Sequence, residues 1–150
     1  MASCQLVPLP AAMDVHQTQR FCAGLPGATV TEWGEPANLL AYFVGGKRFA
    51  HFKTSAPERW RFSFKVAPER FLELTDQPGI KPARWLGRYR WITVVDVRAM
   101  PEEELQSLIR WSYRAALATL SRARQREIAD AATTPENPPA RGKKRQASPR

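Results

Sequence analysis

The stretch Arg59-Trp-Arg-Phe-Ser-Phe-Lys-Val66 has the most regular pattern in the chain and decides the fold class. Its side chains are alternately charged or polar and large apolar. Successive side chains of a β-strand point to opposite faces of a sheet, so the alternation predicts a strand with one buried and one wet face. The residues predicted for the buried face are Trp60, Phe62, Phe64 and Val66.

The residues upstream of this stretch predict a helix and three further strands. Asp14 is placed to cap a helix that runs to about Leu25. Residues 28–33 and 39–44 are rich in β-branched or apolar side chains, which predicts two strands. Residues 47–53, after Gly45-Gly46, are predicted to form a third strand that runs back along the second. Glycine accepts a positive φ without steric cost, so residues 39–44 and 47–53 are predicted to form a hairpin.

The residues downstream predict a short helix and then more strand. Pro68 suits a first helical turn, and this helix should end before Pro78-Gly79. Residues 84–97 are predicted to be β-rich, with Gly87 as either a bulge or a hairpin turn. The residues expected to share one register there are Trp91, Thr93, Val95 and Val97.

The C-terminal part predicts one long helix and a tail. Apolar residues repeat at helical spacing after Pro101, and arginines continue to Arg126. We therefore expect one α+β domain over residues 1–131, an antiparallel sheet packed against helices. Residues 132–150 are rich in proline, lysine and arginine, which predicts a disordered basic tail.

The overall charge favours a polyanionic partner. The chain has 23 basic and 14 acidic side chains, which gives a formal charge of +9. Such a balance suits nucleic acid or an anionic membrane surface. The sequence has no apolar run of about 18 residues and no secretory leader pattern, so we expect a cytoplasmic protein that does not span a membrane.

Residue types that carry catalysis or hold metals are scarce. His16 and His51 have no catalytic or metal-binding spacing, and Cys4 and Cys22 are too few for a zinc site. His51 is predicted to be a solvated or hydrogen-bonded structural residue. Gly45-Gly46-Lys47 lacks the Ser or Thr of a phosphate-binding loop, which favours a turn. We therefore expect no enzyme activity, no metal and no cofactor.

The candidate binding residues combine cations with aromatic rings. Arginine and lysine pair with phosphate oxygens, and exposed aromatic rings stack on unpaired bases. Arg48 and Lys53 are candidates to extend the set, and an ordinary solvated sheet face is the alternative interpretation. The proposed DNA-binding residues are Lys47, Arg59, Arg61, Lys65, Lys81, Arg84, Trp85, Arg88, Tyr89 and Arg90.

A series of short motifs resembles the MmcQ/YjbR family of small bacterial proteins from about Phe21 to Leu120. The motifs are Leu25-Pro26-Gly27-Ala28-Thr29, Val44-Gly45-Gly46-Lys47 with Phe49-Ala50, Lys65 with Pro68-Glu69, Pro78-Gly79-Ile80-Lys81-Pro82-Ala83, Leu86, Trp91-Ile92-Thr93-Val94 and Ser112-Tyr113.

The resemblance implies a CyaY-like (frataxin-like) α+β fold and a DNA-binding function. Frataxin-like folds can bind iron on an acidic first helix, but residues 13–25 offer only Asp14 as an acid, so that function should not transfer. We therefore expect a monomer that binds DNA, or RNA in its place. The alternative is a non-enzymatic protein-interaction module of the same fold.

Overall fold

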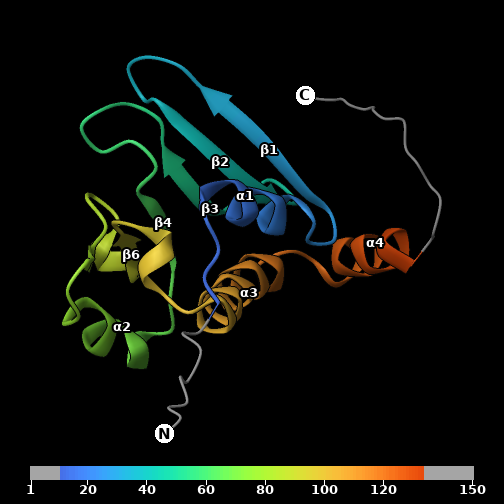
Figure 1. Ribbon diagram of the computed structural model, residues 1–150. Coiled ribbons are helices and arrows are strands. Elements are labelled where there is room, and N and C mark those ends of the chain that lie inside the picture. The colour runs from blue at the N-terminus through green and yellow to red at the C-terminus, as the bar shows by residue number, and fades with distance from the viewer. Residues whose placement is uncertain (1–10, 134–150) are drawn as a thin grey trace, which may run out of the picture.

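The computed structural model describes residues 11–133, in which six strands form a single sheet (Figure 1). The strand order is β1-β2-β3-β4-β6-β5, and each neighbouring pair is antiparallel. This arrangement confirms the predicted α+β class. The elements are α1 (Val15–Ala23), β1 (Ala28–Trp33), β2 (Leu39–Val44), β3 (Lys47–Lys53), β4 (Phe62–Lys65), α2 (Pro68–Thr75), β5 (Ile80–Pro82), the 3₁₀ turn η1 (Gly87–Tyr89), β6 (Trp91–Val94), the 3₁₀ turn η2 (Val97–Ala99), α3 (Glu102–Ala118) and α4 (Arg122–Thr133).

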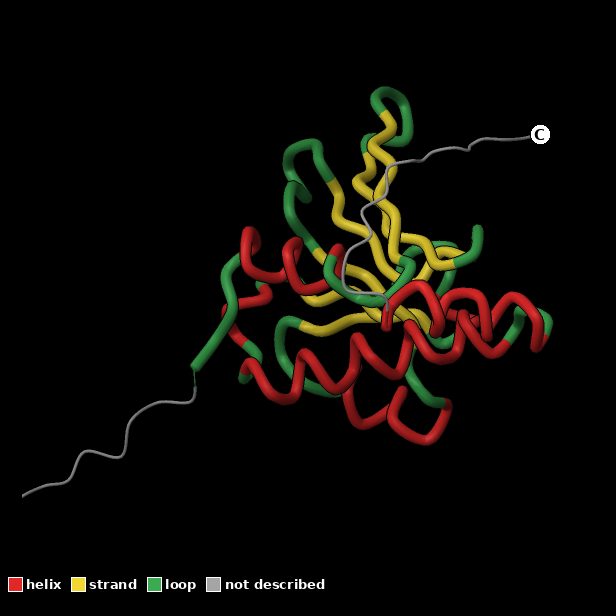
Figure 2. Tube along the Cα trace, turned by 90° about the vertical axis from the view of Figure 1, so that its right-hand side faces the viewer, coloured by secondary structure: helices red, strands yellow, loops and turns green. Residues whose placement is uncertain are grey.

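The predicted hairpin and first helix are confirmed. Strands β2 and β3 pair across Gly45 and Gly46, which both have positive φ. Asp14 caps α1, because its carboxylate accepts a hydrogen bond of 2.8 Å from the backbone N–H of Gln17. Figure 1 shows α1 in front of the strands, and in Figure 2 the helices lie along the left and lower sides of the strands.

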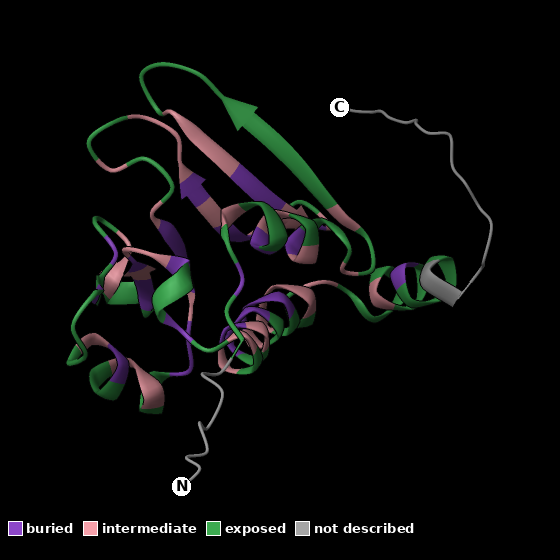
Figure 3. Ribbon diagram, in the orientation of Figure 1, coloured by how far each residue is buried: buried purple, intermediate pink, exposed green. Residues whose placement is uncertain are grey.

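One face of the sheet forms the core with the helices. The strand register places Phe52 opposite Phe62 and Phe64 opposite Ile92, and all four side chains are fully buried. The helices add Cys22, Leu74, Leu105, Ile109 and Tyr113 to the same cluster. Figure 3 shows this buried centre and the exposed edge strand β1.

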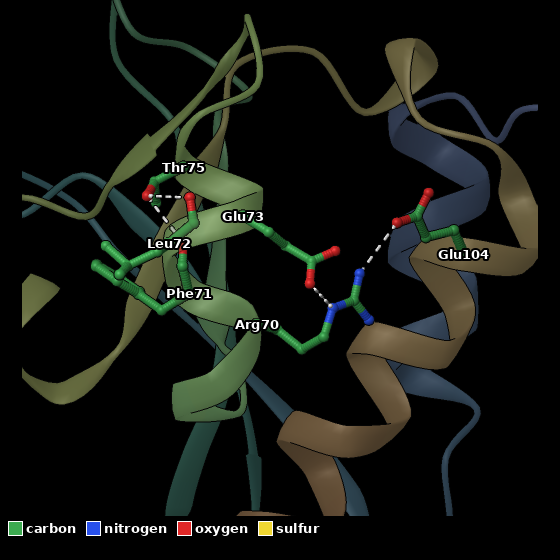
Figure 4. A network of polar contacts seen from close by, with 6 residues as sticks. All are labelled: Arg70, Phe71, Leu72, Glu73, Thr75 and Glu104. Carbon is green, nitrogen blue, oxygen red and sulfur yellow. Dashed lines mark hydrogen bonds and ion pairs between the residues drawn. The ribbon is translucent and has the colours of Figure 1, made fainter.

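The α2 helix is tied to α3 by a polar contact between their side chains. Arg70 forms an ion pair of 3.1 Å with Glu73 on its own helix and one of 3.5 Å with Glu104 on α3 (Figure 4). These side chains are 36–56% exposed, so each pair adds at most about 1 kcal/mol. Packing of Leu74, which is fully buried, therefore holds α2 in place.

The predicted strand over residues 59–66 is corrected at its beginning. Phe62, Phe64 and Val66 are buried as predicted, but β4 begins only at Phe62. Trp60 has φ +70° and is 37% exposed, because the backbone closes a loop in which its N–H donates to the carbonyl of Lys53. A residue in the left-handed conformation interrupts the strand alternation. The prediction that Trp60 lies on the buried face of this strand is therefore wrong.

The predicted β-rich segment over residues 84–97 is also shorter in the structure. Residues 84–90 form a loop that contains η1, and β6 ends at Val94. Trp91 and Thr93 do share a face, but it is the one opposite Ile92 and Val94. Trp91 is nevertheless buried, because its ring stacks on His51 at 5.6 Å.

The single long helix expected after Pro101 is two helices. The break lies at Thr119–Ser121, where the Ser121 hydroxyl accepts a hydrogen bond of 3.1 Å from the N–H of Arg124. Beyond the break, Ile128 packs against Gly27, where an added Cβ would lie 2.8 Å from the isoleucine side chain. Apart from residues 132–133, which belong to α4, the predicted tail lies outside the described residues, as does Cys4.

Candidate nucleic-acid interface

A groove of about 700 Å³ lies on the sheet face away from the helical core. Its lining residues come from strands and from the loops that follow β1, β3 and β5, and none of them belongs to an α-helix. Strands β3, β4 and β6 place His51, Ser63 and Thr93 side by side across this face. The Ser63 and Thr93 hydroxyls are hydrogen-bonded to each other at 2.7 Å, which orders the base of the groove.

Cationic side chains surround the groove. They come from β3, from the loop before β4, and from β5 with the loop that follows it. We call this hollow the basic groove and define it by Arg48, Lys53, Arg61, Lys81 and Arg84. The convergence depends on the sheet, since antiparallel pairing brings residues more than 30 positions apart onto one face.

Glu58 is the acidic side chain among the described residues that line the basic groove. Its carboxylate lies 3.1 Å from the guanidinium of Arg84 and 3.8 Å from that of Arg61. It therefore bridges the loop before β4 and the loop after β5. The carboxylate accepts a hydrogen bond from Arg84 and lies within ion-pair distance of Arg61.

His51 lies at the base of the basic groove with an unsatisfied nitrogen. Its Nδ1 is buried and has no hydrogen-bond partner within residues 11–133, while its ring stacks on Trp91 with an interplanar angle of 21°. Burial, and then the positive charges of Arg48 and Lys53, lower the pKa of His51 from 6.5 to about 3. At neutral pH the ring is therefore uncharged.

The structure brings four of the ten proposed DNA-binding residues to this groove: Arg61, Lys81, Arg84 and Trp85. Lys47 and Lys65 line a separate hollow of about 220 Å³ beside α3, which shares Arg48 with the basic groove. The Nε of Arg59 donates instead to the carbonyl of Thr54 at 3.2 Å.

The remaining three residues occupy the loop before β6 without lining the groove. Arg88 lies over the ring of Tyr89 at 5.0 Å and donates a hydrogen bond of 2.9 Å to its hydroxyl. Arg90 lies over Phe71 at 5.6 Å. These contacts occupy one face of each ring and hold the guanidinium groups close to the protein.

Two groove residues were missed or misread from the sequence. Glu58 was not among the candidates, and nothing in its local sequence distinguishes it from other surface acids. His51 was predicted to be solvated or hydrogen-bonded, which is wrong for its buried Nδ1. Its environment depends on cross-strand neighbours such as Trp91, which the residues next to it in sequence do not reveal. Arg48 and Lys53, the candidate extensions, do line the groove.

Residues 11–133 contain no group of three or more His, Cys, Asp or Glu side chains arranged to hold a metal ion. No helix within the same range is long and apolar enough to cross a membrane. Cys22 is fully buried in the core, which raises the pKa of its thiol.

Comparison with known proteins gives a family match and similar solved structures. A family model described as YjbR matches residues 23–115. The Deinococcus radiodurans protein DR2400, with a domain named DUF419, is 28% identical, with a TM-score of 0.65 over 83% of this chain and 92% of its own. A Pseudomonas syringae protein is 22% identical, with a TM-score of 0.58 over 69% of this chain and 99% of its own, which indicates a shared fold. No curated protein matches the chain.

Proposed function

Given that this chain belongs to the YjbR family, we propose that it is a cytoplasmic DNA-binding protein that holds phosphate groups in the basic groove. The observation that carries the proposal is the convergence of Arg48, Lys53, Arg61, Lys81 and Arg84 on one hollow. On an ordinary solvated sheet face, the cations would have no reason to line the same groove. Phosphate oxygens accept hydrogen bonds from guanidinium and ammonium groups, so one strand of backbone could contact several of these side chains.

The mode of action in this proposal is binding, without catalysis. Contacts to phosphate carry no sequence information, so affinity for DNA of any sequence is expected. A monomer is sufficient, because the cations that define the basic groove belong to one chain. The second candidate function is protein interaction, in which the same groove binds an acidic partner protein. Carboxylates of that partner would pair with the groove cations as Glu58 pairs with Arg84 and Arg61.

The affinity for DNA is expected to fall steeply as salt concentration rises. Each neutralised phosphate releases about 0.9 counterion from duplex DNA, so about five contacts give a slope of about −3 to −5 in a plot of log K against log salt. Fluorescence anisotropy with labelled DNA at several salt concentrations measures this slope. A flat plot, or no binding at physiological salt, would exclude DNA binding and favour the protein-interaction module.

The Glu58→Gln variant is expected to bind DNA more tightly than the wild type, by about three- to tenfold. The wild-type carboxylate competes with phosphate for Arg61 and Arg84, whereas glutamine keeps the shape and removes the charge. Anisotropy titrations of both proteins at the same salt concentration measure the change.

The matched control for Glu58→Gln is Glu73→Gln. Glu73 also forms an ion pair with an arginine, at 3.1 Å to Arg70, but it lies on α2 outside the groove (Figure 4). The control removes the same charge from the protein and should change the affinity little. A weaker affinity in Glu58→Gln would mean that Glu58 orients the two arginines and does not compete with phosphate.

A further inference from the structure

Trp85 is an exposed aromatic ring with no protein partner in the described part of the chain. Its side chain is 86% exposed, and no ring contact or side-chain hydrogen bond within residues 11–133 holds it. Its backbone has φ +68°, a conformation that a bulky residue rarely adopts. Tryptophan is normally well buried, so an exposed ring on a strained loop indicates a surface that contacts something else.

The positive charge around Trp85 favours a negatively charged partner. The ring lines the basic groove beside Arg84, and the segment from Lys81 to Arg90 contains no acidic residue. Tyr89, on the same loop, differs because Arg88 lies over its ring. Trp85 is therefore the uncovered aromatic side chain next to the groove cations, with both faces of its ring available within the described structure.

A ring beside a phosphate-binding groove distinguishes paired from unpaired nucleic acid. In a duplex the faces of the bases are already stacked on one another, and the protein reaches only their edges and the backbone. In a single strand each base has a free π-face that can stack on an aromatic side chain while the adjacent phosphates meet cations. The groove provides both kinds of contact within one hollow.

We propose that the basic groove binds an unpaired nucleic-acid strand, with Lys81 and Arg84 on its phosphates and one base stacked on Trp85. This inference rests on the proposed function and adds a preference for single strands. Two observations support it: the uncovered ring of Trp85 and the cations that line the same hollow.

The test compares a labelled thymidine oligonucleotide with a duplex of equal length, by anisotropy with the full chain at one salt concentration. The wild type is expected to bind the single strand about tenfold more tightly or better, since stacking of one base on an aromatic ring has an effect of that order. Trp85→Ala should lose this advantage and keep its affinity for the duplex. Trp85→Phe, which retains an aromatic ring, should recover most of the affinity for the single strand.

The control is Leu72→Ala, which removes another highly exposed apolar side chain, 77% exposed, from outside the groove. It should leave both affinities unchanged. Equal or tighter binding of the duplex, or a Trp85→Ala protein that still prefers the single strand, would overturn this inference while the proposed function stands. Absence of binding to both probes would reject the proposed function, and this inference would fail with it.

Discussion

The double variant Lys81→Glu/Arg84→Glu is expected to bind DNA at least about 100-fold more weakly than the wild type. Hydrogen bonds to charged groups contribute about 1.5–3 kcal/mol each, and loss of two corresponds to about two or more powers of ten in affinity. Glutamate also repels phosphate, which adds to the loss. Both side chains are exposed, and the ion pair between Arg84 and Glu58 is a surface contact, so the melting temperature should stay within a few degrees of that of the wild type.

The control for this charge reversal is Arg122→Glu/Arg126→Glu on α4. It changes the net charge by the same amount at two exposed positions outside the groove. This protein should keep most of its affinity, apart from the general loss of attraction that follows from lower net charge. If both double variants lose affinity equally, the overall charge of the protein explains binding and the groove has no special role.

The second large effect is expected in the pH dependence of folding, through His51. Its pKa is about 3 in the folded protein and 6.5 when unperturbed, so between these values the unfolded chain takes up a proton that the folded protein does not. The stabilising effect of the uncharged ring is therefore complete above about pH 6.5 and is lost as the pH falls towards 3. At about 1.4 kcal/mol per pH unit, His51 should reduce the free energy of unfolding by about 2–3 kcal/mol between pH 6.5 and 4.5.

The variant that isolates this contribution is His51→Phe, which keeps a ring against Trp91 and does not titrate. Urea unfolding of both proteins at several pH values should show a smaller acid-induced loss of stability in the variant. His16→Gln, at an exposed position of α1, controls for removal of a histidine. An equal pH dependence in wild type and His51→Phe would mean that water reaches the His51 ring in the folded protein.

The sequence reveals the candidate role of Lys81 and Arg84, but it does not reveal the environment of His51. The charge reversal uses Lys81 and Arg84, which were candidates because cations in a segment without acids are visible in the sequence itself. The pH experiment uses His51, whose environment could not be predicted. Its pKa depends on burial beneath the groove and on Arg48 and Lys53, and burial is a property of packing between strands.

Local sequence patterns predict the α+β class, the hairpin around Gly45-Gly46, the cap at Asp14 and the buried positions of Phe62 and Phe64, and the structure confirms each of them. Each of these follows from local chemistry: side-chain periodicity, the conformational freedom of glycine and the capping of helix N–H groups. The family resemblance stated from its motifs is confirmed by the match over residues 23–115.

Contacts between residues far apart in the sequence determine where the strand alternation stops and which cations come together. Trp60 leaves the pattern because the loop that it closes requires a left-handed residue, and Trp91 is buried against the ring of His51, a residue of β3. Glu58 accepts a hydrogen bond from Arg84, which lies 26 positions away in the sequence. Such tertiary contacts depend on strand register and on the path of the loops. Both are determined by the free energy of the whole fold and not by the residues adjacent in sequence.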